Sequence, residues 1–223
     1  YLTEDKNFFD ETPQDENTVT IDPGMNCTAD VVFGWFVKEL LYAKEEDGVL
    51  RLDTWQHRAV AVNDGNKLVA KAGSGDCPCK QFTLEVVSSG AERVAELAQR
   101  ADHVVVCAGN QPLINAREEY DRPDIRLPKA QTALLNAAAA ANESTLLYLV
   151  TGYPFAINKE KDTAKAVLCS THLGPCLGHV AAATVFGENN PAGRTPTTWY
   201  RSVRDLPALD DYDIAKNHVT YLY

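Results

Sequence analysis

The sequence has no long apolar run and no surplus of basic residues, and each absence excludes a class of function. None of its apolar stretches approaches the roughly 18 residues that cross a bilayer, so we expect no membrane-spanning helix. Its 21 Lys and Arg against 31 Asp and Glu give a formal charge of −10, which disfavours nucleic acid and anionic membrane surfaces as partners. We therefore expect a soluble protein whose ligand is neutral or cationic.

The amino terminus and the cysteines leave the compartment open between bacterial cytoplasm and secretion. Residues 1–5 lack the basic start and the apolar stretch of a secretion signal, and because there is no initiator Met we expect the sequence to begin within a longer protein. Cys77 and Cys79 have a single residue between them, whereas zinc-binding pairs have about two to four. We predict neither a metal site nor a cofactor. Asn26-Cys27-Thr28 and Asn142-Glu143-Ser144 match the glycosylation pattern, which often occurs by chance.

The first region, residues 1–88, has the pattern of an all-β module. Short alternating segments are separated by Gly, Asn and Asp, without a convincing helix. The pairs Asp47-Gly48 and Asp64-Gly65 predict hairpins closed by type I′ turns, because such turns need residues that tolerate positive φ. An all-β module therefore precedes whatever follows residue 88.

This module resembles the fascin-like β-trefoil family. Tyr1-Leu2-Thr3, Lys67–Ala70 and Phe82–Glu85 fit the strand positions of its repeating unit. Only two units are visible where a trefoil has three, so either the sequence begins inside the module or residues 1–88 are a smaller, partially trefoil-like β-insert. Such modules bind sugars or partners, or act as spacers. We favour a spacer, because aromatic residues at alternating strand positions belong more often to a core than to a binding surface.

The second region, residues 89–223, alternates helix and strand patterns, which predicts an α/β fold with a mainly parallel sheet flanked by helices. The expected helices are 91–100, 128–142 and 175–186, and the expected strands are 103–108, 145–151 and 166–170. The strands are continuous apolar runs, which favours burial on both faces of the sheet. Cys107 and Cys169 lie in two of these runs, where we expect their thiols to pack as small hydrophobic groups.

An unusually long and charged connection follows the first of these strands. Connections in α/β units normally have about 2 to 6 residues, and open α/β sheets bind ligands beyond the carboxyl ends of their strands. We therefore predict that this loop is functional. Its charged residues are Arg117, Glu118, Glu119, Asp121, Arg122, Asp124 and Arg126.

The order of motifs from residue 101 onward resembles the carboxy-terminal α/β domain of family 3 glycoside hydrolases, the β-glucosidase and β-xylosidase group. The matching motifs are ADHVVVCAGN, REEYDR, LPKAQ, LVTGYP, GHVAAATVFGENNPAGRTPTTW and TYLY. In the bacterial β-xylosidase-like branch a β-module interrupts this domain, as residues 1–88 would do here. One departure is Gly174–Gly178, where the family has a polar pair between the turn glycines.

The resemblance implies a retaining β-glycosidase with a carbohydrate substrate. In this family an Asp on an amino-terminal barrel is the nucleophile, and that barrel, which this sequence lacks, would be the partner of the present domain. A Glu in the charged loop is the acid/base, which corresponds to Glu118, with Glu119 as its competitor. Asp121 and Arg122 are expected to pair and to hold the loop, since Arg and carboxylates form bidentate pairs.

Two other interpretations stay open beside this one. The chain could be a catalytically silent carbohydrate-binding or interaction fragment in which the α/β region is only scaffold. A nucleotide-binding, flavodoxin-like domain is disfavoured, because no Gly-rich phosphate loop follows the first strand and the acidic loop would repel phosphate. His172 and His179 are expected to be hydrogen-bonded structural residues.

Overall fold

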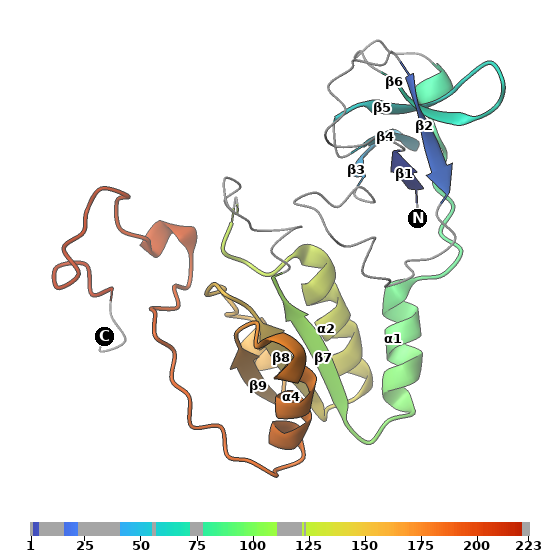
Figure 1. Ribbon diagram of the computed structural model, residues 1–223. Helices are drawn as coiled ribbons and strands as arrows, with labels where there is room; N and C mark the ends of the chain where they lie inside the picture. Colours follow the sequence, from blue (N-terminus) through green and yellow to red (C-terminus); the bar gives the residue numbers. More distant parts are fainter. Residues whose placement is uncertain are drawn as a thin grey trace. The chain divides into compact units, whose positions relative to one another are not determined.

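The computed structural model divides the chain into two compact units, Tyr1–Val87 and Ser88–Tyr223. Figure 1 shows a group of strands in the first unit and alternating strands and helices in the second. The structure describes residues 2–4, 16–21, 41–54, 57–71, 78–110, 122 and 124–219.

The first unit contains one antiparallel sheet with the strand order β1-β2-β6-β5-β4-β3. Its strands are β1 (Leu2–Glu4), β2 (Glu16–Ile21), β3 (Tyr42–Glu46), β4 (Val49–Asp53), β5 (Ala59–Val62) and β6 (Leu68–Lys71), and the short 3₁₀ helix η1 (Pro78–Lys80) follows. In its centre Val60 lies opposite Ala70 and Ala61 opposite Val69. All four side chains are buried, so β5 and β6 carry the core of this unit.

The two expected hairpin turns have different structures. Asp47 and Gly48 both have positive φ, 52° and 76°, between β3 and β4, as predicted for a type I′ turn. The turn between β5 and β6 is longer, and the prediction of a type I′ turn at Asp64-Gly65 is wrong. There the positive φ is at Asn66, and the side-chain oxygen of Asn63 accepts hydrogen bonds from the backbone N–H of Gly65 and Lys67, both at 3.0 Å. The side chain of Asn63 thus closes this turn.

The trefoil-like strand expected at Phe82–Glu85 is an isolated bridge. Phe82 exchanges two backbone hydrogen bonds with Leu50 of β4, at 2.8 and 2.9 Å, and the chain leaves the sheet directly afterwards. Leu84, Val86 and Val87 are exposed. A fascin-like origin of the first unit stays a prediction.

The second unit contains a parallel sheet with the order β7-β8-β9, and its α/β fold confirms the prediction. Its strands are β7 (Val104–Gly109), β8 (Thr145–Val150) and β9 (Ala166–Ser170). The register places Gly109 opposite Val150 and Val150 opposite Ser170. The carboxyl ends of the three strands therefore meet at one edge of the sheet.

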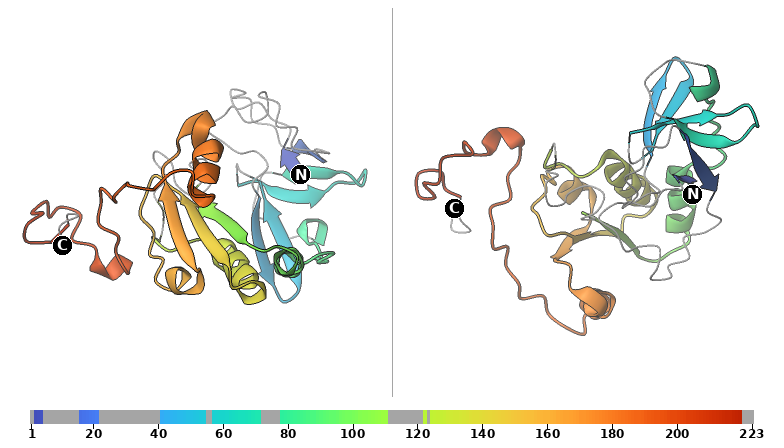
Figure 2. Two further views of the ribbon diagram at one scale, coloured as in Figure 1. Left: turned by 90° about the horizontal axis from the view of Figure 1, so that it is seen from below. Right: turned by 45° about the horizontal axis from the view of Figure 1, so that its top comes forward.

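Helices cover this sheet unequally. They are α1 (Gly90–Gln99), α2 (Lys129–Ala141), α3 (Glu160–Thr163) and α4 (Leu177–Val185), with the 3₁₀ helices η2 (Gly174–Cys176) and η3 (Val203–Asp205). Figure 2 shows α1 and α2 on one face of the sheet and α4 on the other. The core lies under α1 and α2, where Leu135 and Ala138 of α2 pack against Val106, Leu147 and Leu149 of the sheet.

An N-cap and the side chain of Asn142 hold α1 and α2 in place. Ser89 caps α1 by accepting a hydrogen bond from the N–H of Glu92, a standard N-cap contact. Asn142 follows α2, and its Nδ2 donates to the backbone oxygens of Ala98, at 3.0 Å, and Ala101, at 2.6 Å. Asn142 thus ties the ends of the two helices together.

The face of the sheet that α1 and α2 do not cover is partly open. The side chain of Val105 is 43% exposed, and Cys107 and Cys169 are exposed free thiols. The prediction that β7 is buried on both faces, and that both thiols pack inside, is therefore wrong, because Val105 and Cys107 alternate with the core residues of β7 and face the side of the sheet that is not fully covered. The same prediction is correct for β8, the central strand, in which Leu147, Tyr148 and Leu149 are all buried.

The end of the second unit has little regular structure. From residue 187 to residue 219 it forms turns and the single 3₁₀ helix η3. Within it Leu209 and Tyr212 are largely exposed. Among the helices in the described ranges, none combines the length and apolar character needed to cross a membrane.

Candidate functional site

The charged loop leaves the sheet at the carboxyl end of β7, at a position that backbone and side-chain bonds fix. The N–H of Asn110 donates to the backbone oxygen of Val150 at 3.1 Å, and its side-chain oxygen accepts from the N–H of Gly152 at 2.8 Å. Asn110 is only 5% exposed, and its Nδ2 has no hydrogen-bond partner among the described residues. The first residue of the loop is thus attached to the end of β8.

The side chain of Gln131, in α2, holds Gly109, the residue that precedes Asn110. The N–H of Gly109 donates to Oε1 of Gln131, and Nε2 of Gln131 donates to the backbone oxygen of Gly109, both at 3.0 Å. Gly109 has a φ of +138°, and a Cβ there would lie 1.9 Å from the oxygen of Val150. Only glycine therefore fits at this strand end.

Arg122 fixes the chain where the loop returns to the sheet. Its Nη1 and Nη2 both donate to the backbone oxygen of Pro154, at 3.1 and 3.2 Å. The guanidinium lies over the rings of Tyr153 and Phe155, 5.1 and 4.9 Å from their centroids, within cation–π range. Burial lowers the pKa of Arg122, and the nearby Tyr153 acts in the opposite direction. An arginine nevertheless stays protonated in proteins.

The next residues of the chain pair with the segment that follows β8. The backbone oxygen of Ile125 accepts from the N–H of Ala156 at 2.8 Å, and Arg126 forms an isolated parallel bridge with the same residue. Asp124 accepts from Nε of Arg126 at 2.6 Å and forms an ion pair with its guanidinium. This hydrogen bond is the main cause that lowers the pKa of Asp124. Both ends of the loop are therefore anchored at the carboxyl edge of the sheet.

The acidic residues predicted for the site, Glu118, Glu119 and Asp121, lie outside the described residues. Their roles, and the pairing of Asp121 with Arg122, stay predictions. His172 and His179 are exposed, and neither forms a hydrogen bond within the described ranges, so their structural role stays a prediction.

Sequence reasoning missed Asn110 and Gln131, the two side chains that fix the start of the loop. Asn110 is the last residue of the motif ADHVVVCAGN and Gln131 the last of LPKAQ, but the motifs alone gave neither residue a role. A second signal was their place, directly after an apolar strand and in the first turn of the following helix, where side chains reach the carboxyl edge of the sheet.

Comparisons with known proteins agree on one family. The sequence model described as "Glycosyl hydrolase family 3 C-terminal domain" matches residues 14–223. A periplasmic beta-glucosidase of Salmonella typhimurium is 33% identical over 116 residues, which are 52% of this chain and 15% of that protein. Beta-D-xylosidase 3 of Arabidopsis thaliana is 29% identical over 220 residues, 86% of this chain and 28% of that protein.

The solved structures include relatives of the same kind. The GH3 beta-glucosidase of Bifidobacterium adolescentis superposes with a TM-score of 0.50 and 30% identity, covering 59% of this chain and 20% of that one. The chain spans well under a third of the curated relatives cited above, 15% of one and 28% of the other. Because the family model extends from residue 14 to the last residue, the chain belongs to glycosyl hydrolase family 3 and carries its C-terminal domain.

Proposed function

We propose that this chain is the acid/base-bearing domain of a retaining, exo-acting β-glycosidase of the β-glucosidase or β-xylosidase type. Glu118 is the acid/base, and Glu119 is its competitor for that role. The nucleophile is a carboxylate of an amino-terminal barrel domain of the same protein, and the isolated chain is inactive without it. The names of the relatives, beta-glucosidase and beta-D-xylosidase, support this class of reaction.

Retaining hydrolysis of a glycosidic bond has two steps, and the acid/base residue transfers one proton in each of them. In the first step the Glu118 carboxyl protonates the glycosidic oxygen while the barrel carboxylate attacks the anomeric carbon, so that the bond from this carbon to the oxygen breaks. In the second step the Glu118 carboxylate takes a proton from water, which attacks the same carbon and releases the barrel carboxylate. The two carboxyl groups must lie about 5 Å apart for this sequence.

The observation that supports Glu118 is the anchoring of its loop. Asn110 at one end and Arg122 at the other both bind the segment that follows β8. A carboxyl that must reach a second domain at a fixed distance needs such a rigid support, because a displacement of about 1 Å can reduce the rate by a factor of a hundred.

The protein acts outside the cytoplasm in this proposal. Cys79 is disulfide-bonded, and disulfides persist in oxidising compartments such as the bacterial periplasm. The Salmonella relative is named a periplasmic enzyme.

The test is the variant Glu118→Gln in the complete protein with its barrel domain. Without the acid, hydrolysis of glycosides with poor leaving groups is expected to fall about 10² to 10⁴-fold, whereas activated dinitrophenyl glycosides should lose far less in their first step. Added azide, a nucleophile that needs no base, should restore the second step. The pH profile should lose the limb that reports the acid.

The matched control is Glu119→Gln, one residue away and identical in chemistry, which should retain nearly full activity. If Glu119→Gln shows the losses and the azide rescue, the acid/base is Glu119. If neither variant loses activity on poor leaving groups, the acid/base proposal is wrong. If the complete protein with its barrel hydrolyses no glycoside at all, the alternative of a catalytically silent fragment is favoured instead.

A further inference from the structure

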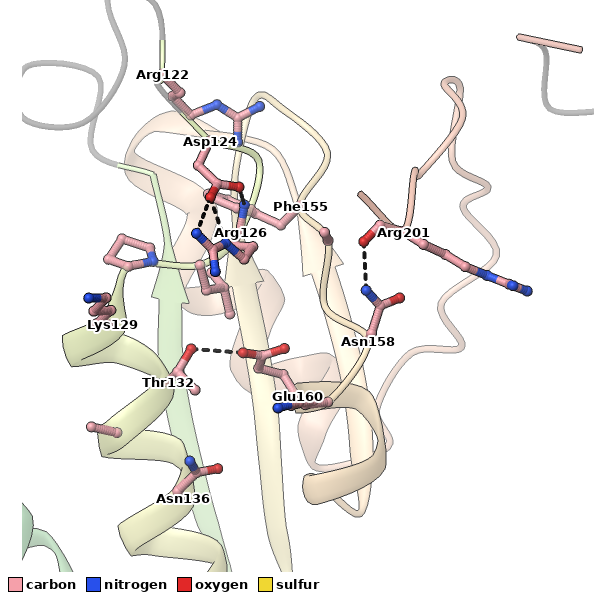
Figure 3. Close-up of a pocket in the computed structure, with 15 residues that line it drawn as sticks. Arg122, Asp124, Arg126, Lys129, Thr132, Asn136, Phe155, Asn158, Glu160 and Arg201 are labelled. Carbon is pink, nitrogen blue, oxygen red and sulfur yellow. Dashed lines mark hydrogen bonds and ion pairs between the residues drawn. The ribbon is translucent and has the colours of Figure 1, made fainter. Parts of the chain in front are cut away.

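A cavity of about 680 Å³ lies in the second unit, beside α2. Figure 3 shows it between α2, the segment that leads from Phe155 into α3, and the returning end of the charged loop. Its volume is within the range of about 300–1,000 Å³ that is typical of small-molecule sites. The buried side chains of Leu127 and Phe155 form apolar parts of its wall.

Glu160 is a buried carboxylate in this wall. It is 8% exposed, and its Oε1 accepts a hydrogen bond from Oγ1 of Thr132 at 2.7 Å. None of the described basic residues forms an ion pair with it, and its Oε2 accepts no hydrogen bond within the described ranges. A carboxylate has about four acceptor positions, of which the hydrogen bond from Thr132 occupies one. Glu160 therefore has unused acceptor capacity in the cavity.

Two amides add donors and acceptors around it. Asn136 follows Thr132 by one turn on the same side of α2, is exposed, and has no hydrogen-bond partner among the described residues. Asn158 donates from Nδ2 to the backbone oxygen of Arg201 at 2.7 Å, which leaves its Oδ1 without a bond to the described chain. Glu160 and these amides offer both hydrogen-bonding roles to a ligand.

The charged residues of the wall disfavour a cation, and the placement of its basic side chains favours a neutral ligand over an anion. The basic wall residues are Arg122, Arg126, Lys129, Lys159 and Arg201, which would repel a cation. An anion would meet the carboxylate of Glu160, while the guanidinium of Arg126 is engaged with Asp124. Figure 3 shows the side chains of Lys129 and Arg201 extending away from Glu160. The described residues contain no group of three or more metal ligands.

We propose that this cavity binds a neutral, hydroxyl-rich molecule, namely a saccharide, through Glu160, Asn136 and Asn158. A hydroxyl group donates to a carboxylate and accepts from an amide at the same time, which is the combination that these residues offer. The proposal does not rest on the acid/base assignment, because binding needs neither turnover nor Glu118.

The test is a titration of the ¹⁵N-labelled 223-residue chain with D-xylose and D-glucose, followed by amide chemical shifts. We expect saturable shifts at Thr132, Asn136 and Glu160 with a dissociation constant in the millimolar range. Glu160→Gln keeps the acceptor for Thr132 but replaces the free oxygen by an N–H donor, and should weaken binding about tenfold. Glu188→Gln, an exposed glutamate outside the wall, should leave binding unchanged.

Asn136→Ala is the second variant, because alanine favours the helix and the fold is preserved even if Glu160→Gln is unstable. It should weaken binding several-fold. The proposal is overturned if neither sugar shifts the wall residues, or if both wall variants bind like the unchanged chain. Tighter binding of D-glucuronate than of D-glucose would overturn the neutral class of ligand.

Discussion

The side chain of Gln131, in the first turn of α2, forms hydrogen bonds with both the N–H and the C=O of Gly109, the last residue of β7, at 3.0 Å each. The two residues are 22 positions apart, and the contact replaces a neighbouring strand at the outer edge of β7. An edge strand that is capped in this way offers no free N–H or C=O at its end.

We predict that Gln131→Leu lowers the free energy of unfolding of the second unit by about 1–3 kcal/mol. The change keeps the size of the side chain but leaves the N–H and C=O of Gly109 without partners. Amide hydrogen exchange of β7 and β8 as a function of urea measures it, because the two units can unfold separately. The control is Gln99→Leu at the exposed end of α1, expected within about 0.5 kcal/mol of the unchanged chain. Equal losses of stability in Gln131→Leu and Gln99→Leu would show that the hydrogen bonds between Gln131 and Gly109 do not stabilise the unit.

A second prediction concerns Gly109 itself. Gly109→Ala should destabilise the second unit by about 3 kcal/mol, because the Cβ would meet the oxygen of Val150 at 1.9 Å and φ is +138°. Gly178→Ala in α4, where nothing lies within 4 Å, should instead stabilise by about 0.5–1 kcal/mol. Thermal unfolding by circular dichroism compares the pair. If the Gly109→Ala protein were as stable as the Gly178→Ala protein, the positive φ of Gly109 and its close approach to Val150 would be refuted.

Much of the second unit could be predicted from the sequence because its signals are local. The run Thr145–Val150 has no polar gap and is the central strand, and Pro128 correctly marks the start of α2. The motifs around REEYDR and NPAGRTPTTW indicated the family that the comparisons then established.

The remaining features depend on tertiary contacts that periodicity does not encode. An apolar run such as that of β7 does not reveal whether a second layer covers it, and Val105 is exposed because it faces the side of the sheet that α1 and α2 do not cover. The cavity around Glu160 brings together α2 and α3, which no spacing rule connects. The prediction of a type I′ turn at Asp64-Gly65 is wrong because the side-chain oxygen of Asn63, rather than the glycine, determines the conformation of this turn.

The third prediction concerns pH. Asp124 has a lowered pKa, chiefly through its hydrogen bond from the side chain of Arg126. A carboxyl with a lowered pKa in the folded state stabilises the fold above its unfolded pKa of about 3.9, and this contribution is lost as the pH falls through the folded pKa. Arg126→Gln should therefore move the pKa of Asp124 upward, part of the way, because the N–H of residue 126 still donates.

The measurement is the titration of the side-chain carboxyl ¹³C resonance between neutral pH and the acid limit of the fold. Asp211 is an internal control, since a hydrogen bond from Lys216 is the main cause of its lowered pKa. Its midpoint should not respond to Arg126→Gln. An unchanged midpoint of Asp124 in that variant would show that Arg126 is not the cause.

The fourth prediction separates the two units by redox state. Cys79 is disulfide-bonded in the first unit, whereas Cys107, Cys169 and Cys176 of the second are free. Reduction should lower the free energy of unfolding of the first unit by about 2–4 kcal/mol and leave the second unchanged. Hydrogen exchange of β5 and β6 against β8, with and without dithiothreitol, measures this. Loss of protection in β8 alone would contradict it.

Asn142 joins α1 to α2 through its side-chain nitrogen, which donates to Ala98 and Ala101. The same nitrogen is the atom to which an oligosaccharide would be attached in the triplet Asn142-Glu143-Ser144. In the folded protein both hydrogens of this nitrogen are engaged, and attachment of a glycan would replace one of them and so remove at least one of the two hydrogen bonds. A glycan at this position would therefore have to be attached to the nascent chain, before α1 and α2 pack against each other.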